Sequence, residues 1–188
     1  METKKYKLTD DTIIVDGHEL HRIQALIDFS DVKCGDVGGY IESEDNLSQY
    51  ENCWVGGNAK VYGYAEVFGN AQVLENAKVF GNAKVYDDAK IYGNAQVYGN
   101  AFVCDYAEVC GNAKIYGNAI ICDITDYIVF KNNWSSGRYF TWTKSNNMWK
   151  VGCFYGTGEE LIKKAYADSE VSGRNYEKYV KFVESLNQ

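Results

Sequence analysis

The chain has 188 residues, a formal net charge of −7, six cysteines and no proline. Acidic residues outnumber basic ones over residues 1–126, which does not favour binding to duplex nucleic acid, because phosphate contacts require clustered Lys and Arg. No apolar run is long enough for a membrane-spanning helix or a signal peptide, so we expect a cytoplasmic protein that does not enter membranes.

Residues 4–33 have the pattern of a β-hairpin. Thr12–Val15 is rich in β-branched residues, Asp16-Gly17 is a strong two-residue turn signal, and His18–Ile23 is the expected returning strand. We predict that residues 1–36 form a hairpin cap over the open end of the segment that follows. His18 and His21 would point to opposite faces of a strand, so we predict surface residues there and no metal site.

A six-residue phrase, V-x-G-N-A-x, repeats without a break from Val55 to Cys122. Its first position is always Val or Ile, which favours a strand, and its fifth position is Ala from Ala59 to Ala119. Gly is most frequent at the third position and Asn at the fourth, and both residues tolerate turn conformations. Repeats this short are typical of a β-helix, in which each unit is a strand followed by a corner.

The same register extends upstream in a degenerate form. Steps of six residues from Val55 give Gln49, Ser43 and Val37 at the first position. We therefore predict an atypical first coil over residues 37–54, because the terminal repeats of a stack differ from the inner ones.

The repeat resembles that of the hexapeptide-repeat proteins. This resemblance implies a left-handed parallel β-helix with three units in each triangular coil, so that residues 37–126 would form about five coils. It also implies self-association into a homo-oligomer, with a trimer as the form often seen among related β-helices.

Three units in each coil would stack residues that are 18 positions apart. First-position residues then form three inner columns, and second-position residues form an outer aromatic stripe of Tyr62, Phe80, Tyr98 and Tyr116. The stripe is consistent with ordinary stacking on an exposed sheet, with a ligand platform, or with the interface of a homo-oligomer. Among the functional interpretations we favour the interface.

Residues 127–188 break the repeat and are predicted to form a small α+β domain. Strands are expected at Tyr127–Lys131, Tyr139–Lys144 and Met148–Phe154. Gly156-Thr157-Gly158 precedes a helix whose Thr157 and Glu160 have capping-box spacing. A second helix is expected to begin at Ser172 and to run to Leu186, where apolar residues follow helical spacing.

Aromatic and basic residues alternate in this last segment, which is the pattern of a site that stacks a base and holds a phosphate. The helix start adds backbone N–H groups suited to an anion. The candidate ligand- or partner-binding residues are Arg138, Trp142, Lys144, Trp149, Lys150, Gly156, Thr157 and Gly158. The alternative is that the large side chains only form the core that a small domain needs.

The six cysteines contain no C-x-x-C pair, so no zinc site is predicted. Cys104 and Cys122 should stack in neighbouring coils, and we expect them to be reduced thiols in a cytosolic protein.

The hexapeptide-repeat family includes acyltransferases, which use a histidine base projecting from a coil and an extended loop, and γ-class carbonic anhydrases, which bind zinc through three histidines. Residues 55–126 contain neither a histidine nor an insertion. We therefore predict a protein that is not an enzyme and that has no cofactor and no bound metal.

The chain as a whole is similar to a narrower group of hexapeptide-repeat proteins that bacteriophages and prophages encode. The similarity rests on Leu20–Ile23, Gly38–Glu42, Asn46–Ser48, the repeats and the aromatic tail. It implies a binding protein that counters host antiviral immunity, either by binding a host defence protein or by sequestering a small nucleotide signal. The alternatives are a structural or assembly module and a hexapeptide acyltransferase.

Overall fold

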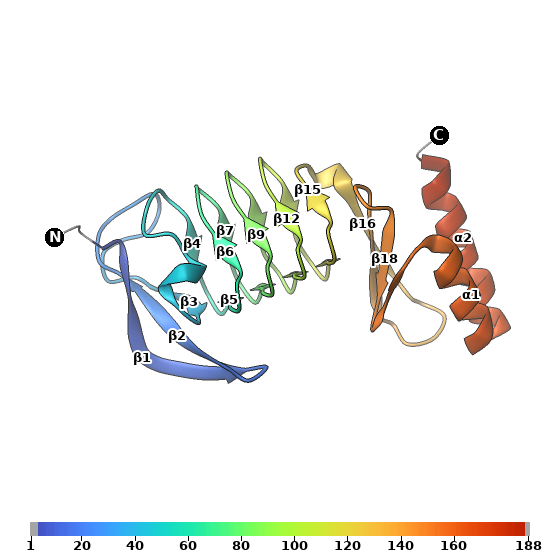
Figure 1. The fold of residues 1–188 in the computed structure, drawn as a ribbon, viewed down its shortest axis with the longest axis horizontal. Coiled ribbons are helices and arrows are strands. Elements are labelled where there is room, and N and C mark those ends of the chain that lie inside the picture. The colour runs from blue at the N-terminus through green and yellow to red at the C-terminus, as the bar shows by residue number, and fades with distance from the viewer. Residues whose placement is uncertain (1–3, 187–188) are drawn as a thin grey trace. The chain divides into compact units, whose positions relative to one another are not determined.

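The computed structural model describes residues 4–186 and confirms the predicted fold class. The chain divides into two compact units, with the boundary between Asp126 and Tyr127. The first unit is a hairpin followed by a parallel β-helix of about five turns (Figure 1). The second unit is an antiparallel sheet with two helices.

The first unit begins with β1 (Tyr6–Val15), β2 (His18–Ala25), β3 (Val37–Ile41) and the short 3₁₀ helix η1 (Glu44–Asn46). Two-residue strands then follow, one in each repeat unit: β4 (Trp54–Val55), β5 (Lys60–Val61), β6 (Glu66–Val67), β7 (Gln72–Val73), β8 (Lys78–Val79), β9 (Lys84–Val85), β10 (Lys90–Ile91), β11 (Gln96–Val97), β12 (Phe102–Val103), β13 (Glu108–Val109), β14 (Lys114–Ile115) and β15 (Ile120–Ile121). A second 3₁₀ helix, η2 (Ile124–Asp126), closes the unit.

The strands stack into three sheets, one for each side of the coil. Their orders are β1-β2-β3-β5-β8-β11-β14, β4-β7-β10-β13 and β6-β9-β12-β15, and the repeat strands pair in parallel. All twelve first-position side chains from Val55 to Ile121 are at most 1% exposed, so the three predicted inner columns are confirmed. Each of these side chains contributes about 1.5–3 kcal/mol by leaving water.

The corners explain the choice of residue at the third position. Gly63, Gly81 and Gly99 have φ values of 69°, 72° and 77°, in the left-handed region that favours glycine. The corners also stack closely, since a Cβ placed on Gly93 would lie 2.8 Å from the backbone N of Gly111. Asparagine ladders join successive corners: Asn82 Nδ2 donates to Asn100 Oδ1 at 2.9 Å.

The first coil departs from the predicted register. Ile41 pairs with Val61 and Leu47 bridges to Val67, a separation of 20 residues, whereas Val61 pairs with Val79 at the regular 18. Ile41 and Leu47 are therefore the inward residues of this coil. The prediction of Val37 at an inward position was wrong, because Val37 is 55% exposed. Two extra residues between Leu47 and Val55 cause the shift and widen one corner.

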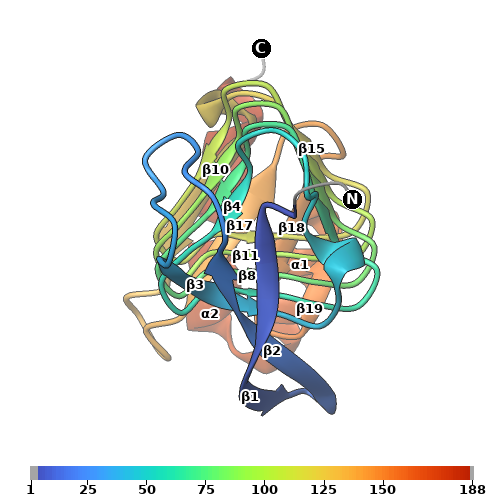
Figure 2. The same ribbon diagram turned by 90° about the vertical axis from the view of Figure 1, so that its left-hand side faces the viewer.

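The hairpin covers the edge of the first coil, because β2 pairs antiparallel with β3. Asp16 and Gly17 have φ values of 51° and 88°, so the predicted two-residue turn is confirmed. Figure 2 faces the N-terminal side of the first unit and shows the hairpin crossing in front of the coils and projecting beyond them. Pairing with β2 satisfies the backbone groups of a strand that would otherwise be exposed at an edge.

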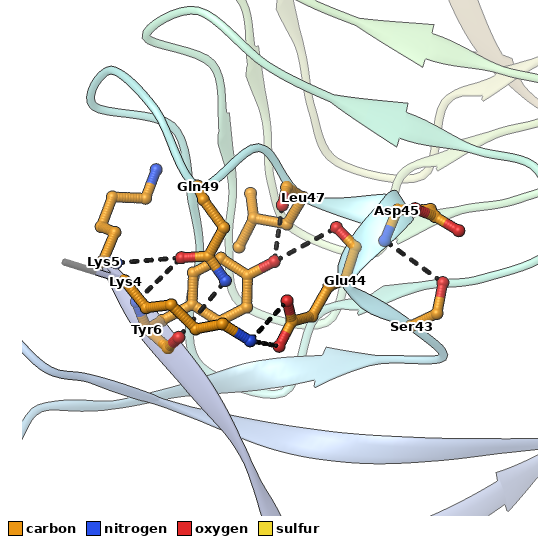
Figure 3. A network of polar contacts seen from close by, with 8 residues as sticks. All are labelled: Lys4, Lys5, Tyr6, Ser43, Glu44, Asp45, Leu47 and Gln49. Atoms are coloured by element: carbon orange, nitrogen blue, oxygen red, sulfur yellow. Dashed lines mark hydrogen bonds and ion pairs between the residues drawn. The ribbon is translucent and has the colours of Figure 1, made fainter. Parts of the chain in front are cut away.

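A polar network fixes the start of β1 on the first coil (Figure 3). Gln49 Oε1 accepts from the backbone N–H of Lys5 at 2.9 Å and of Tyr6 at 3.3 Å. The Tyr6 side chain is fully buried, and its hydroxyl donates to the carbonyl oxygen of Leu47. Lys4 forms an ion pair with Glu44 at 2.6 Å. These contacts replace the regular coil-to-coil hydrogen bonds at the irregular end of the stack.

The second unit consists of β16 (Tyr127–Lys131), β17 (Tyr139–Thr143), β18 (Met148–Val151), β19 (Phe154–Gly156), α1 (Gly158–Asp168) and α2 (Glu170–Leu186). The sheet has four strands where three were predicted, because the chain turns at Gly152, with a φ of 57°, and Phe154 pairs back with Val151. The helix predicted from Ser172 begins two residues earlier, at Glu170.

Cys104 and Cys122 stack in neighbouring coils, as predicted, and their sulfur atoms are paired with each other. Their Cα atoms are 4.8 Å apart, within the range that a disulfide spans. Cys34, Cys53, Cys110 and Cys153 lie outside this pair.

No helix within residues 4–186 has the length and apolar character needed to cross a membrane.

Two substitutions separate backbone strain from steric contact at the corners. Gly93 and Gly111 have φ values of 73° and 65°, so alanine at either position should cost about 1–2 kcal/mol of unfolding free energy. A Cβ at Gly111 meets no atom within 4 Å, whereas at Gly93 it meets the next corner, and this contact should add about 1–3 kcal/mol. Urea denaturation should therefore show a larger loss for Gly93→Ala than for Gly111→Ala. Equal losses would contradict the close stacking of the corners.

Candidate functional site at the hairpin tip

The tip of the β1–β2 hairpin lies against the outer face of the coils. Leu20 and Tyr62 are buried together with Tyr40, and Ile13 and Phe80 pack against this cluster. The Tyr62 hydroxyl donates to Asp16 Oδ2 at 2.8 Å. Burial, and then this hydrogen bond, raise the pKa of Tyr62 well above its ordinary value. The hairpin tip is thus held by both apolar packing and a charge-assisted hydrogen bond.

A histidine–carboxylate pair lies beside this contact. His18 Nδ1 is 2.8 Å from Glu42 Oε1, and Glu42 Oε2 accepts from the backbone N–H of Gly63 at 2.7 Å. The hydrogen bond from His18, followed by that from Gly63, holds the pKa of Glu42 below its ordinary value, although partial burial opposes this. An ionised Glu42 requires the proton on Nδ1 in this bond. The imidazole Nε2 remains open to another group.

The position of Glu42 is fixed by Asn46, a buried residue of η1. Asn46 Oδ1 accepts from the backbone N–H groups of Glu42 and Ser43, at 3.1 and 3.0 Å. Its Nδ2 donates to the carbonyl oxygens of Gly63 and Ala65, at 3.0 and 2.9 Å. A buried amide with all of these bonds satisfied ties the turn after β3 to the next coil. The carboxylate is therefore held in place by the fold itself.

These groups line a cavity of about 640 Å³, which is in the range of small-molecule and side-chain binding sites. The lining residues are His18, Glu42, Ser43, Asp45, Asn46, Gly63, Tyr64, Ala65 and Glu66. Three of them are acidic, and Glu66 is paired with Lys84 at 3.0 Å. The lining contains no Lys or Arg. Such a cavity repels phosphates and favours a cationic group.

The two tryptophans predicted as ligand-stacking residues belong to the core of the second unit. Trp142 and Trp149 are 3% and 2% exposed and pack with Phe140, Leu161 and Val180. The Trp142 Nε1–H donates to Asn147 Oδ1 at 2.9 Å. Their rings are covered by neighbouring side chains, so stacking on a ligand would require the core to open.

The Gly156-Thr157-Gly158 segment also has a structural role. The Thr157 N–H donates to Glu160 Oε2 at 2.8 Å, and the Glu160 N–H donates to Thr157 Oγ1 at 3.3 Å, so the predicted capping box is confirmed. The chain's own carboxylate therefore occupies the place that an anion would take at this helix start. A Cβ on Gly158 would lie 2.6 Å from Val180 Cγ1, so a small residue is needed where α1 meets α2.

The three predicted cations differ in exposure and in the cavity they line. Arg138 is exposed and lines a cavity of about 200 Å³ together with Lys164 and Tyr176. Lys144 is exposed and Lys150 is half-buried, and neither lines that cavity. This cavity therefore contains one of the three predicted cations.

The aromatic stripe forms as predicted but is only partly open. Ring centroids are 5.1 Å apart for Tyr62 and Phe80, 4.7 Å for Phe80 and Tyr98, and 4.6 Å for Tyr98 and Tyr116. The hairpin covers Tyr62, which is 3% exposed, so this residue is not free for an oligomer interface. Phe80, Tyr98 and Tyr116 are half-buried.

Among residues 4–186, one group of three potential metal ligands lies close together, namely Cys104, Asp105 and Cys122, with ligand atoms within 4.8 Å. The two sulfur atoms are paired with each other, and Asp105 is exposed.

No protein-family model matches the chain, and no curated protein matches it in sequence.

The pairing of Glu42 predicts a pH-dependent contribution to stability. A carboxylate of lowered pKa stabilises the fold above its unfolded-state pKa, and this contribution is lost as the pH falls through the lower folded-state value. We expect Glu42→Gln to unfold at lower urea concentration than the wild type near neutral pH, and the difference to shrink below about pH 4. Glu19→Gln, at an exposed position of β2, is the control. A difference that stays constant with pH would show that the charge of Glu42 is not responsible.

Proposed function

We propose that this chain is a phage- or prophage-encoded member of the hexapeptide-repeat proteins and that it acts in the host cytoplasm as a noncatalytic binding protein against antiviral immunity. The acidic cavity at the hairpin tip is the observation that carries this proposal. Its carboxylate, imidazole and backbone groups are held by hydrogen bonds within the fold, as for Glu42 and Asn46. A preorganised site loses less conformational entropy on binding.

The chemistry of the cavity favours a host defence protein over a nucleotide as the partner. The carboxylates of Glu42 and Asp45 suit a Lys or Arg side chain, which can form charge-assisted hydrogen bonds with them. Tyr64 is 84% exposed on the lining and offers an aromatic face to the same cation. The lining offers a nucleotide phosphate no Lys or Arg side chain.

A nucleotide signal would have to bind elsewhere. The cavity beside Arg138 and Lys164 has suitable charges, but its volume of about 200 Å³ is below the roughly 300 Å³ from which ligand pockets begin. This comparison supports the protein partner as the first candidate.

Charge reversal in the cavity tests the proposal. Asp45 is exposed, so Asp45→Lys should leave the fold intact while placing a cation where a partner's cation would lie. Immobilised wild-type protein should retain a host protein from lysate, Asp45→Lys should lose most of it, and Glu19→Lys should keep it. In infected cells that carry the defence system, phage yield should be high with the wild type and Glu19→Lys and lower with Asp45→Lys.

Two outcomes of these experiments would contradict the proposal. Equal capture by the wild type and Asp45→Lys would show that the cavity is not part of the binding site. A nucleotide released by heating protein purified from signal-producing cells would overturn the choice of a protein partner.

The His18–Glu42 pair favours acyl transfer as the second candidate. A carboxylate that holds Nδ1–H leaves Nε2 able to take a proton from an acceptor hydroxyl or amine. This imidazole comes from the hairpin rather than from a coil. Calorimetric binding of acetyl-CoA, together with acyl transfer that His18→Gln abolishes, would favour the enzyme. The binding-protein proposal predicts that neither is observed.

A further inference from the structure

Lys5 inserts its side chain into the widened corner of the first coil. Its Nζ lies 3.3 Å from Cys53 Sγ. Lys5 is 2% exposed and Cys53 is fully buried. The amine nitrogen and the sulfur are thus in contact and shielded from bulk water.

The surroundings hold the two groups together. Lys5 Nζ donates to the carbonyl oxygens of Tyr50 at 3.1 Å and Cys53 at 2.9 Å, and lies 5.1 Å from the centroid of the Phe29 ring. Burial lowers the pKa of the Lys5 ammonium and raises the pKa of the Cys53 thiol, although each group partly offsets the shift of the other. Burial therefore favours the neutral amine, which is the nucleophilic form of lysine.

We propose that Lys5 and Cys53 form a redox-sensitive pair that hydrogen peroxide converts into a covalent sulfur–nitrogen cross-link. In the first step the sulfur attacks one peroxide oxygen, the O–O bond breaks, and Cys53 becomes a sulfenic acid with release of one water molecule. In the second step the Lys5 nitrogen attacks the sulfur, an S–N bond forms, the S–O bond breaks, and a second water leaves with a proton from the amine. The pair loses two hydrogen atoms, and one peroxide becomes two waters.

The cross-link would act on the part of the molecule that supports the hairpin. Lys5 directly precedes β1, and Cys53 directly precedes β4, so the bond would join the foot of the hairpin to the first coil. Peroxide reaches the pair when local opening uncovers the start of β1. This inference does not depend on the proposed function, because it concerns a different cluster from the acidic cavity.

The test treats the full-length protein with hydrogen peroxide, digests it and analyses the peptides by tandem mass spectrometry. The expected product is a peptide pair that joins residues 5 and 53, has lost two hydrogen atoms and separates again on treatment with dithiothreitol. Exposed Cys34 reports that oxidation took place.

Matched variants assign the product to this pair. Lys5→Arg keeps a cation but removes the amine, and should give no cross-link, whereas Lys4→Arg should give the wild-type amount. Cys53→Ala should also give none, and it should fold, because Ala59 and Ala65 occupy the equivalent place in the regular coils. The proposal is overturned if Cys53 is recovered only as thiol, sulfinic or sulfonic acid while Cys34 is fully oxidised, or if the cross-link persists in Lys5→Arg.

Discussion

The close approach of successive corners is the constraint on which this structure depends. At Gly93 the next corner lies so near that a Cβ would be only 2.8 Å from the backbone N of Gly111. Together with the buried columns of Val and Ile, this spacing holds every regular coil to three units of six residues. A rod built in this way has no room for a loop or for a large polar side chain inside it. The acidic cavity accordingly lies outside the coils, beside the irregular first coil.

The first coil shows how the molecule accommodates a break in the pattern. Two extra residues widen one corner, and Lys5 donates to the carbonyl oxygens of Tyr50 and Cys53 there. At another corner the buried Asn46 ties the turn after β3 to the second coil. The hairpin then folds over Tyr62 and brings His18 to Glu42. The contacts that anchor the hairpin on the irregular first coil therefore also place the side chains that line the acidic cavity.

The regular coils could be predicted from sequence because their spacing is local and repeated: Val61, Val79 and Val97 stack as their period of 18 requires. The first coil could not be predicted in this way. Two residues are inserted between Leu47 and Val55, so Ile41 and Leu47 take the inward positions in place of those that a strict period of six gives. The His18–Glu42 contact depends on the path of a hairpin with an irregularity between Leu8 and Thr12. Trp142 and Trp149 suit both a site and a core by sequence, and only their packing distinguishes the two.

Hydrogen–deuterium exchange on the complex with a captured host protein would test the proposed binding site most directly. If the hairpin tip and the first coils hold a cationic group of the partner, binding should protect backbone amides in residues 42–46 and 63–66, which line the acidic cavity. Protection confined to residues 127–186, with exchange around Glu42 unchanged, would contradict this account.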